Sequence, residues 1–294
     1  MAIRSIRLSR ILLAALLWLM SGMVVPASAQ KAQKPPRGYP EKISFNKKSF
    51  SEFQKSWSAL QKDYGLSYRN QVLDSVGCTV AQLTLPSKPI KLELNLKDKD
   101  TLATALIAIR GFIDKYPGVF HTSSKEIIPS SIVDYGKVWD IICERAMYKE
   151  FPASGQSRGK IEFILSKSGE LHVLASTMTR KAASLPDSAT YPKNKIYGKL
   201  EGRTLSFAIG DKKVRFKIDR LDVIKIGRVC VYEDKKLQDI YGTKGKLIEK
   251  RLRQTVPYLA YEVKIGEDVQ KPVATIFFDA ITGKEIAVEY PRVE

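Results

Sequence analysis

The sequence has few of the residues from which metal centres are built. Its 294 residues include only two histidines, His121 and His172, and three cysteines. Neither histidine belongs to a His-Glu-x-x-His pair, so the zinc-binding helix motif is missing from the sequence. We therefore expect no metal site and no cofactor.

The three cysteines leave two arrangements open. Cys78, Cys143 and Cys230 could form one disulfide with one free thiol left over, or they could be three buried thiols. Cys78 and Cys143 both lie in the N-terminal half and are the preferred pair, although a sequence does not give the distance between them.

Recognisable catalytic motifs are also missing. There is no Gly-x-Ser-x-Gly nucleophile elbow and no phosphate-binding Gly-x-x-x-x-Gly-Lys-Ser/Thr loop. We interpret His172 as a structural histidine, Cys143 as a small buried hydrophobe, and Asp219 and Asp222 as unrelated to a glycosidase pair. No pattern in the sequence combines a nucleophile, a base and an orienting group. This predicts a non-catalytic protein, and an enzyme of unfamiliar design is the alternative.

Long apolar runs are scarce, and the one present lies at the N-terminus. Residues 11–25 are mostly apolar, follow three arginines, and precede a small-x-small sequence that ends at Ala29. This is the pattern of a signal peptide over residues 1–29. The run is shorter than the ~20 residues of a membrane-spanning helix, which favours cleavage over an uncleaved anchor. We expect export, to the periplasm or outside the cell, after cleavage near Ala29.

Basic residues are in excess. Lys and Arg number 49 against 31 Asp and Glu, a formal net charge of +18. Such a surface favours anionic partners, which for an exported protein include envelope polymer and lipid. Nucleic acid is not expected, since none of its common binding motifs is present. The candidate anion-binding residues are Lys244, Lys246, Lys250, Arg251 and Arg253.

Helical periodicity occurs in the N-terminal half. Residues 30–48 contain several prolines and basic residues, and predict a flexible basic lead-in. Ser49 and Glu52 have the spacing of a capping box, so a helix is expected to begin there and to end at Gly65. Its aromatic and aliphatic stripe at helical spacing, which includes Phe53, Trp57 and Leu60, is interpreted as a core face. A second apolar face over residues 102–116 predicts another helix, stopped by Pro117-Gly118.

Most of the remaining sequence has strand periodicity. A hairpin is expected around Lys167-Ser168-Gly169, and residues 180–195, which lack periodicity, are interpreted as a domain boundary. A turn from Asp279 to Gly283, with an acceptor at its start and glycine at its end, is expected to join the last two strands. The fold class is α+β: antiparallel sheets with a few packing helices. Strands are expected at 72–85, 90–96, 137–149, 160–166, 170–175, 205–209, 214–218, 258–265, 273–278 and 285–290, and a polar loop before residue 137.

Two stretches near the C-terminus resemble a known family. Residues 258–265 read YLAYEVKI and residues 273–286 read VATIFFDAITGKEI. They are similar to the C-terminal PepSY module of thermolysin-type protease propeptides. The residues that carry the resemblance, as a structural strand and turn, are Leu259, Ala260, Tyr261, Glu262, Val263, Asp279, Ala280, Thr282 and Gly283.

An earlier region resembles the companion module of the same propeptides, the fungalysin/thermolysin propeptide (FTP) module. The similarity lies in residues 103–120, 142–153 and the hairpin that follows, while residues 150–155 depart from the family pattern. The resemblance implies two cystatin-like or propeptide-like modules, an FTP-like domain over 49–185 and a PepSY-like domain over 196–294.

The resemblance also implies a function. Propeptides of this family help a protease to fold and block its active site. Because the zinc-binding motif is missing here, we expect a free-standing relative that inhibits, chaperones or regulates an exported hydrolase. The alternative is an envelope structural or adaptor protein that binds anionic surface polymer or lipid through its basic faces.

Overall fold

The computed structural model describes residues 35–66, 71–84, 89–94, 101–209, 212–241 and 247–291. The predicted signal peptide lies outside these residues. The chain from Pro35 onward forms one compact unit. Within the described part, no helix has both the length and the apolar character that a bilayer crossing needs.

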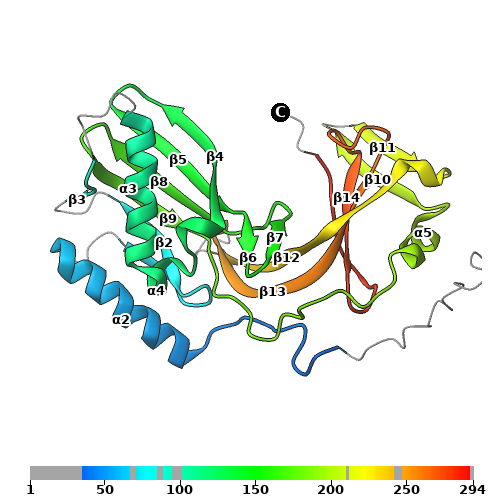
Figure 1. The fold of residues 1–294 in the computed structure, drawn as a ribbon, viewed down its shortest axis with the longest axis horizontal. Coiled ribbons are helices and arrows are strands. Elements are labelled where there is room, and N and C mark those ends of the chain that lie inside the picture. The colour runs from blue at the N-terminus through cyan, green and yellow to red at the C-terminus, as the bar shows by residue number, and fades with distance from the viewer. Residues whose placement is uncertain are drawn as a thin grey trace, which may run out of the picture. The chain divides into compact units, whose positions relative to one another are not determined.

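An antiparallel seven-stranded sheet is built from the N-terminal half. Helices α2 (Lys47–Tyr64), α3 (Thr101–Lys115) and α4 (Pro117–Phe120) pack against it (Figure 1). In spatial order the strands are β1 (Gln71–Asp74), β2 (Thr79–Thr84), β9 (Glu170–Ser176), β8 (Lys160–Ser166), β5 (Val138–Arg145) and β4 (Ile127–Asp134), with β3 (Ile90–Lys91) also paired to β9.

The helices follow the predicted periodicity, but their ends differ from the prediction. The predicted start of α2 at Ser49 is wrong: Asn46 is the N-cap, and its Oδ1 accepts the backbone N–H of Ser49 at 3.0 Å. Gly65 ends the helix with a φ of 60°, as expected. Pro117 ends α3 and at the same time begins α4, because proline suits a first helical turn.

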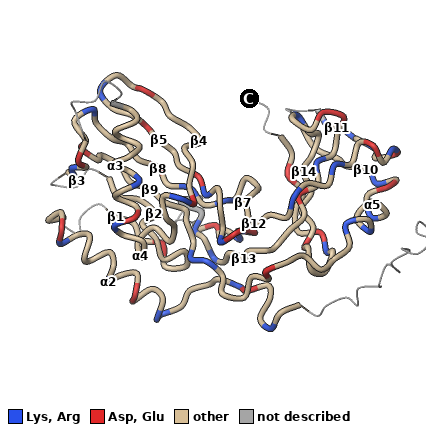
Figure 2. Tube along the Cα trace, in the orientation of Figure 1, with Lys and Arg blue, Asp and Glu red and all other residues tan. Residues whose placement is uncertain are grey.

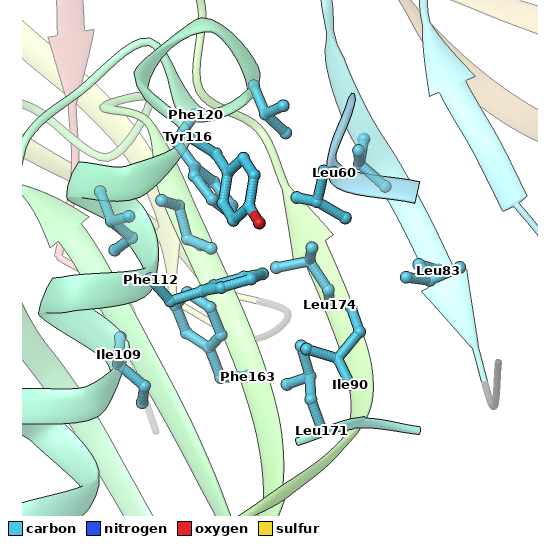
Figure 3. Packing of buried hydrophobic residues seen from close by; sticks show 14 of the residues in the cluster. Leu60, Leu83, Ile90, Ile109, Phe112, Tyr116, Phe120, Phe163, Leu171 and Leu174 are labelled. Carbon is cyan, nitrogen blue, oxygen red and sulfur yellow. The ribbon is translucent and has the colours of Figure 1, made fainter. Parts of the chain in front are cut away.

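The core of this half lies between the helices and the sheet. Figure 3 shows Ile109 and Phe112 of α3 facing Phe163, Leu171 and Leu174 of β8 and β9. Phe53, Trp57 and Leu60, the aromatic and aliphatic stripe of α2, are buried in the same cluster. The stripe is therefore a core face, as its helical spacing predicted.

All three cysteines are free, buried thiols, so the Cys78–Cys143 pairing is wrong and the arrangement of three thiols is found. Cys78 immediately precedes β2, whereas Cys143 lies in β5, and β9 and β8 separate these two strands. Three strand spacings of about 4.8 Å place the cysteines much farther apart than a disulfide allows.

A six-stranded sheet forms most of the C-terminal half. Its strand order is β15-β14-β13-β12-β7-β6. The centre is a long hairpin of β12 (Ile224–Tyr241) and β13 (Leu247–Ile265), of which the sequence predicted only residues 258–265 as strand. The other strands are β14 (Ala274–Asp279), β15 (Glu285–Glu289), β7 (Phe151–Ser154) and β6 (Met147–Tyr148).

Smaller elements complete the unit. Helix α5 (Asn194–Leu200) precedes the predicted hairpin of β10 (Thr204–Ile209) and β11 (Lys212–Lys217). Two single-turn 3-10 helices, η1 (Ser124–Glu126) and η2 (Leu221–Val223), precede β4 and β12.

The fold class is α+β with antiparallel sheets, as predicted. The domain boundary between 185 and 196 stays a prediction. Strands β6 and β7 precede that boundary in sequence, yet β7 pairs in parallel with β12 and so belongs to the C-terminal sheet.

Candidate functional site

Strand β4 is an edge of the seven-stranded sheet and carries exposed apolar side chains. Among the described strands it pairs only with β5. Ile132 and Val133 are 39% and 40% exposed, and Tyr135, directly after the strand, is 65% exposed. An edge strand offers unpaired backbone groups to another chain, and most proteins protect such edges with charges or a covering element.

The register of β4 shows which backbone groups are available. Ile132 lies opposite Ile141, and Val133 opposite Asp140. The Tyr135 N–H donates to the Val138 carbonyl at 2.9 Å, so Tyr135 points its backbone groups toward β5. Because this direction alternates along an antiparallel strand, Val133 also points inward and Ile132 presents its N–H and C=O to the free side.

Both ends of β4 carry features that limit pairing. Near its start, Pro129 is followed by a bulge before Ser131. At its end, the Lys167 ammonium lies 2.6 Å from the Asp134 carboxylate and 3.8 Å from the centre of the Trp139 ring. The hydrogen bond from Lys167 lowers the pKa of Asp134. The segment between these two features remains open for pairing.

The open segment carries an apolar side chain on each of its two faces. Residues opposite each other in an antiparallel pair share a face, so Ile132 lies on the face of Ile141, which is fully buried in the core. Val133 and Ile128 lie on the other face. An extended segment added to β4 would therefore meet apolar side chains on both sides.

The strand motif of the family resemblance lies inside the C-terminal core. Leu259, Ala260, Tyr261 and Val263 are buried residues of β13, and the Glu262 carboxylate accepts a hydrogen bond from the Ser154 hydroxyl at 2.8 Å. These residues form structure and are not available to a partner as an exposed surface.

The turn motif is equally internal. Asp279 Oδ1 accepts the Ile281 N–H at 2.8 Å and the Tyr39 hydroxyl at 3.0 Å, and Oδ2 accepts the Thr282 hydroxyl at 2.9 Å. Gly283 has a φ of 69°, and Ala280 is fully buried. Burial and the neighbouring Asp279 raise the pKa of Tyr39. The motif thus closes the β14–β15 turn, as its residue types predicted.

The candidate anion-binding residues are only partly described. Lys244 and Lys246 lie outside the described residues, as does the side chain of Lys250, while Arg251 and Arg253 are exposed on β13. Figure 2 shows further Lys and Arg residues on β11 and α5. On β11, Lys213, Arg215 and Lys217 alternate with less exposed residues and so share one exposed face.

A buried ion pair connects the two sheets. The Arg145 guanidinium of β5 lies 2.9 Å from the Glu233 carboxylate of β12, and the side chains are 0% and 1% exposed. Arg145 also donates to the carbonyls of Thr179, at 2.8 Å, and His121, at 3.2 Å. Glu233 accepts the Thr179 hydroxyl at 2.8 Å. The sequence does not reveal this pair, because the two residues are 88 positions apart in the chain.

The thiols and the histidine that were candidates for chemistry lie in surroundings that indicate a structural role. Burial raises the pKa of the Cys143 thiol to about 11 and that of Cys230 to about 12, the opposite of thiol activation. The His121 Nε2 lies 2.6 Å from the Cys78 carbonyl. No cluster of three metal-ligating side chains occurs in the described ranges. The expectation of a non-catalytic protein stays a prediction.

The comparisons with known proteins do not assign this chain to a family. No protein-family model matches the chain, and no curated protein matches it. Among solved structures, the C-terminal domain of YpeB from Bacillus megaterium aligns with 85% of this chain and 99% of its own, at 13% identity and a TM-score of 0.29. A TM-score this low carries no argument, so the functional proposal depends on the residues described above.

Proposed function

We propose that this chain is a non-catalytic exported protein that binds another exported protein by strand addition to β4. The observation that carries the proposal is the open segment of β4, with Ile132 and Val133 exposed and the backbone of Ile132 directed outward. Strand addition derives its affinity from backbone hydrogen bonds and its specificity from side chains on alternate faces.

The proposed partner is an exported hydrolase. The resemblance of residues 258–265 and 273–286 to a propeptide module supports this class, because propeptides of that kind inhibit or chaperone a protease. The net charge of +18 favours an acidic partner and would speed its association. Inhibition, chaperoning and regulation would all use the same docking edge.

The test combines an activity assay with one backbone substitution. Hydrolases secreted by the source organism would be assayed for activity and for refolding yield, with and without micromolar purified protein. Ile132→Pro removes the outward N–H that a partner strand would use and leaves the ladder to β5 intact. Ile132→Thr retains the N–H and is the matched control.

The proposal predicts that the parent protein and Ile132→Thr change the activity or the refolding yield of one hydrolase, and that Ile132→Pro does so at least tenfold more weakly. Circular dichroism and the urea midpoint would show that each variant folds. An unchanged effect in folded Ile132→Pro would refute docking at β4, and no effect on any secreted hydrolase would refute the function.

A second candidate function is adhesion to anionic envelope polymer or lipid. The observation in its favour is the basic face of β11, where Lys213, Arg215 and Lys217 have no ion-pair partner among the described residues. Exposed charges are screened beyond about 10 Å at 0.1 M salt. Binding to anionic polymer should therefore disappear at about 0.5 M salt, and salt-resistant binding would contradict this function.

A further inference from the structure

A cavity of about 360 Å³ lies where strands of the two sheets approach each other. Its walls come from β1, β2 and the end of β9 on one side, and from β12 and β13 on the other. Apolar side chains cover much of its surface: Val72, Leu73, Ala81, Leu237 and Leu252. This volume lies at the lower end of the range for small-molecule sites, which are mostly apolar with a few placed polar groups.

The principal polar group of the cavity is Lys235. It lines the cavity from β12, and its ammonium donates to the Thr177 carbonyl at 3.0 Å. Its side chain is only 14% exposed. Burial lowers the pKa of Lys235, as expected for a cation that has lost most of its hydration.

Lys235 forms no close ion pair of its own with the described residues in this neighbourhood. The nearest carboxylate is Glu233, 4.0 Å away, and Glu233 already has Arg145 at 2.9 Å. Two buried cations thus share one buried carboxylate. A buried cation that shares its carboxylate with another cation is stabilised when a further anion binds, because charges interact more strongly away from bulk water.

Among the described residues, Asp74 is the one carboxylate that lines the cavity, and it attracts Lys235 electrostatically. Its Oδ1 accepts the Val76 N–H at 2.9 Å within its own turn, and burial raises the pKa of this carboxyl, so Asp74 is no close partner of the ammonium. Ser75, Ser176 and Thr177 are uncharged. The cavity is therefore largely apolar, with the Lys235 ammonium as the cationic group at one end.

We propose that this cavity binds a small amphiphilic carboxylate, with the carboxylate against Lys235 and the alkyl chain against Val72, Leu237 and Leu252. At about 30 Å³ per water-sized group, the cavity has room for roughly a dozen non-hydrogen atoms. Octanoate, with eight carbons and two oxygens, is of this size. The proposal goes beyond the strand-addition function and uses none of the residues of β4.

The test is titration calorimetry of the purified full chain with octanoate, octan-1-ol and acetate. Octanoate should bind and the other two should bind at least tenfold more weakly, because each lacks either the charge or the alkyl chain. Equal binding of octanoate and octan-1-ol would refute the role of Lys235. Equal binding of octanoate and acetate would refute the role of the apolar wall, and absence of octanoate binding at millimolar concentration would refute the site.

Three variants locate the binding. Lys235→Gln removes the charge and retains a donor for the Thr177 carbonyl, and should weaken octanoate binding at least tenfold. Lys236→Gln is the matched control, since Lys236 is exposed, pairs with Asp234 at 2.9 Å and does not line the cavity. Val72→Trp should block the cavity from the wall opposite Lys235, which keeps the test valid if Lys235→Gln does not fold.

The variants also separate this site from the docking edge. Octanoate binding should be unchanged in Ile132→Pro, and the effect on a hydrolase should be unchanged in Lys235→Gln. Full octanoate affinity in folded Lys235→Gln or in folded Val72→Trp would overturn the proposed site while leaving the proposed function untouched.

Discussion

The outer strands of the two sheets, β15 and β4, differ in how far their residues are covered. At the edge of the six-stranded sheet, every residue of β15 is at least partly covered. Arg203 forms a bidentate pair with Glu285, and Phe207 stacks on Tyr290 directly after the strand, with ring centroids 4.8 Å apart. At the edge of the seven-stranded sheet, β4 exposes most of its residues, including Ile132 and Val133.

The difference indicates where another chain can be accommodated. The β15 edge is covered from within the same unit, by the side chains of Arg203 and Phe207 and by the Gln156 N–H, which donates to the Glu289 carboxylate at 2.9 Å. The β4 edge has a bulge and an ion pair at its two ends, but its middle has no covering element among the described residues. A partner strand at β4 would supply the cover that β15 receives from its own chain.

The largest expected effect concerns whether the two sheets form one cooperative unit. Arg145→Ala removes the cation that joins β5 to β12 and leaves Glu233 buried with Lys235 at 4.0 Å. The free energy of unfolding should fall by about 3–5 kcal/mol. Urea denaturation followed by circular dichroism and by tryptophan fluorescence would measure it.

The control for Arg145 is Arg220→Ala, which removes an exposed pair with Asp222 and should leave the urea midpoint unchanged. Two separate transitions in the parent protein would contradict the picture of one unit. The comparison of the two edges would then apply to two independent domains.

The next effect concerns the turn that holds β15 in place. Asp279→Ala leaves the N–H of Ile281 and the hydroxyls of Tyr39 and Thr282 without their acceptor in a buried site. We expect a loss of about 3 kcal/mol in the free energy of unfolding. Asp279→Asn retains one acceptor oxygen and should recover part of this loss. Equal urea midpoints for all three proteins would show that the turn does not secure this edge.

A smaller effect concerns acid sensitivity on the side of the seven-stranded sheet. Burial, together with the nearby Arg145 cation, lowers the pKa of His121 below its ordinary value of 6.5. The unfolded chain therefore binds more protons than the folded protein just below pH 6.5, and stability should fall as the pH decreases through that range. Urea midpoints between pH 7.5 and 5 would measure the fall.

The matched variant for this effect is His121→Asn. Asparagine does not titrate and tolerates the φ of 51° at this position. Its urea midpoint should depend less on pH than that of the parent protein over the same range. An equal pH dependence in both proteins would assign the acid sensitivity to other groups.

The sequence predicted those elements whose signals are local. The stripe of Phe53, Trp57 and Leu60 predicted α2 and its buried face. Gly169, which has a φ of 88°, predicted the turn between β8 and β9. The Asp279–Gly283 turn followed from its acceptor and its glycine. In each case, the residues that determine the structure are neighbours in the chain.

The elements that the sequence did not predict depend on contacts between residues that are far apart in the chain. Strand β12 was not predicted, because its charged residues Glu233 and Lys235 do not follow the pattern of a buried strand, and the partner that allows Glu233 to be buried, Arg145, is 88 residues away. Strand β4, the docking edge, was not predicted because the polar Ser130 and Ser131 interrupt the alternation of apolar and polar residues. An edge strand does not need this alternation. The cavity was also missed, since its walls come from separate strands.

The smallest expected effect tests how firmly the β15 edge is covered. Arg203→Ala removes a bidentate pair whose side chains are each about one third exposed, and such pairs contribute about 0.5 kcal/mol. The stacking of Phe207 on Tyr290 remains, so β15 should stay covered and gain no affinity for the hydrolase bound at β4. Urea denaturation and the hydrolase assay measure the two outcomes. If Arg203→Ala created a second site for the partner, the ion pair itself would be what distinguishes the two edges.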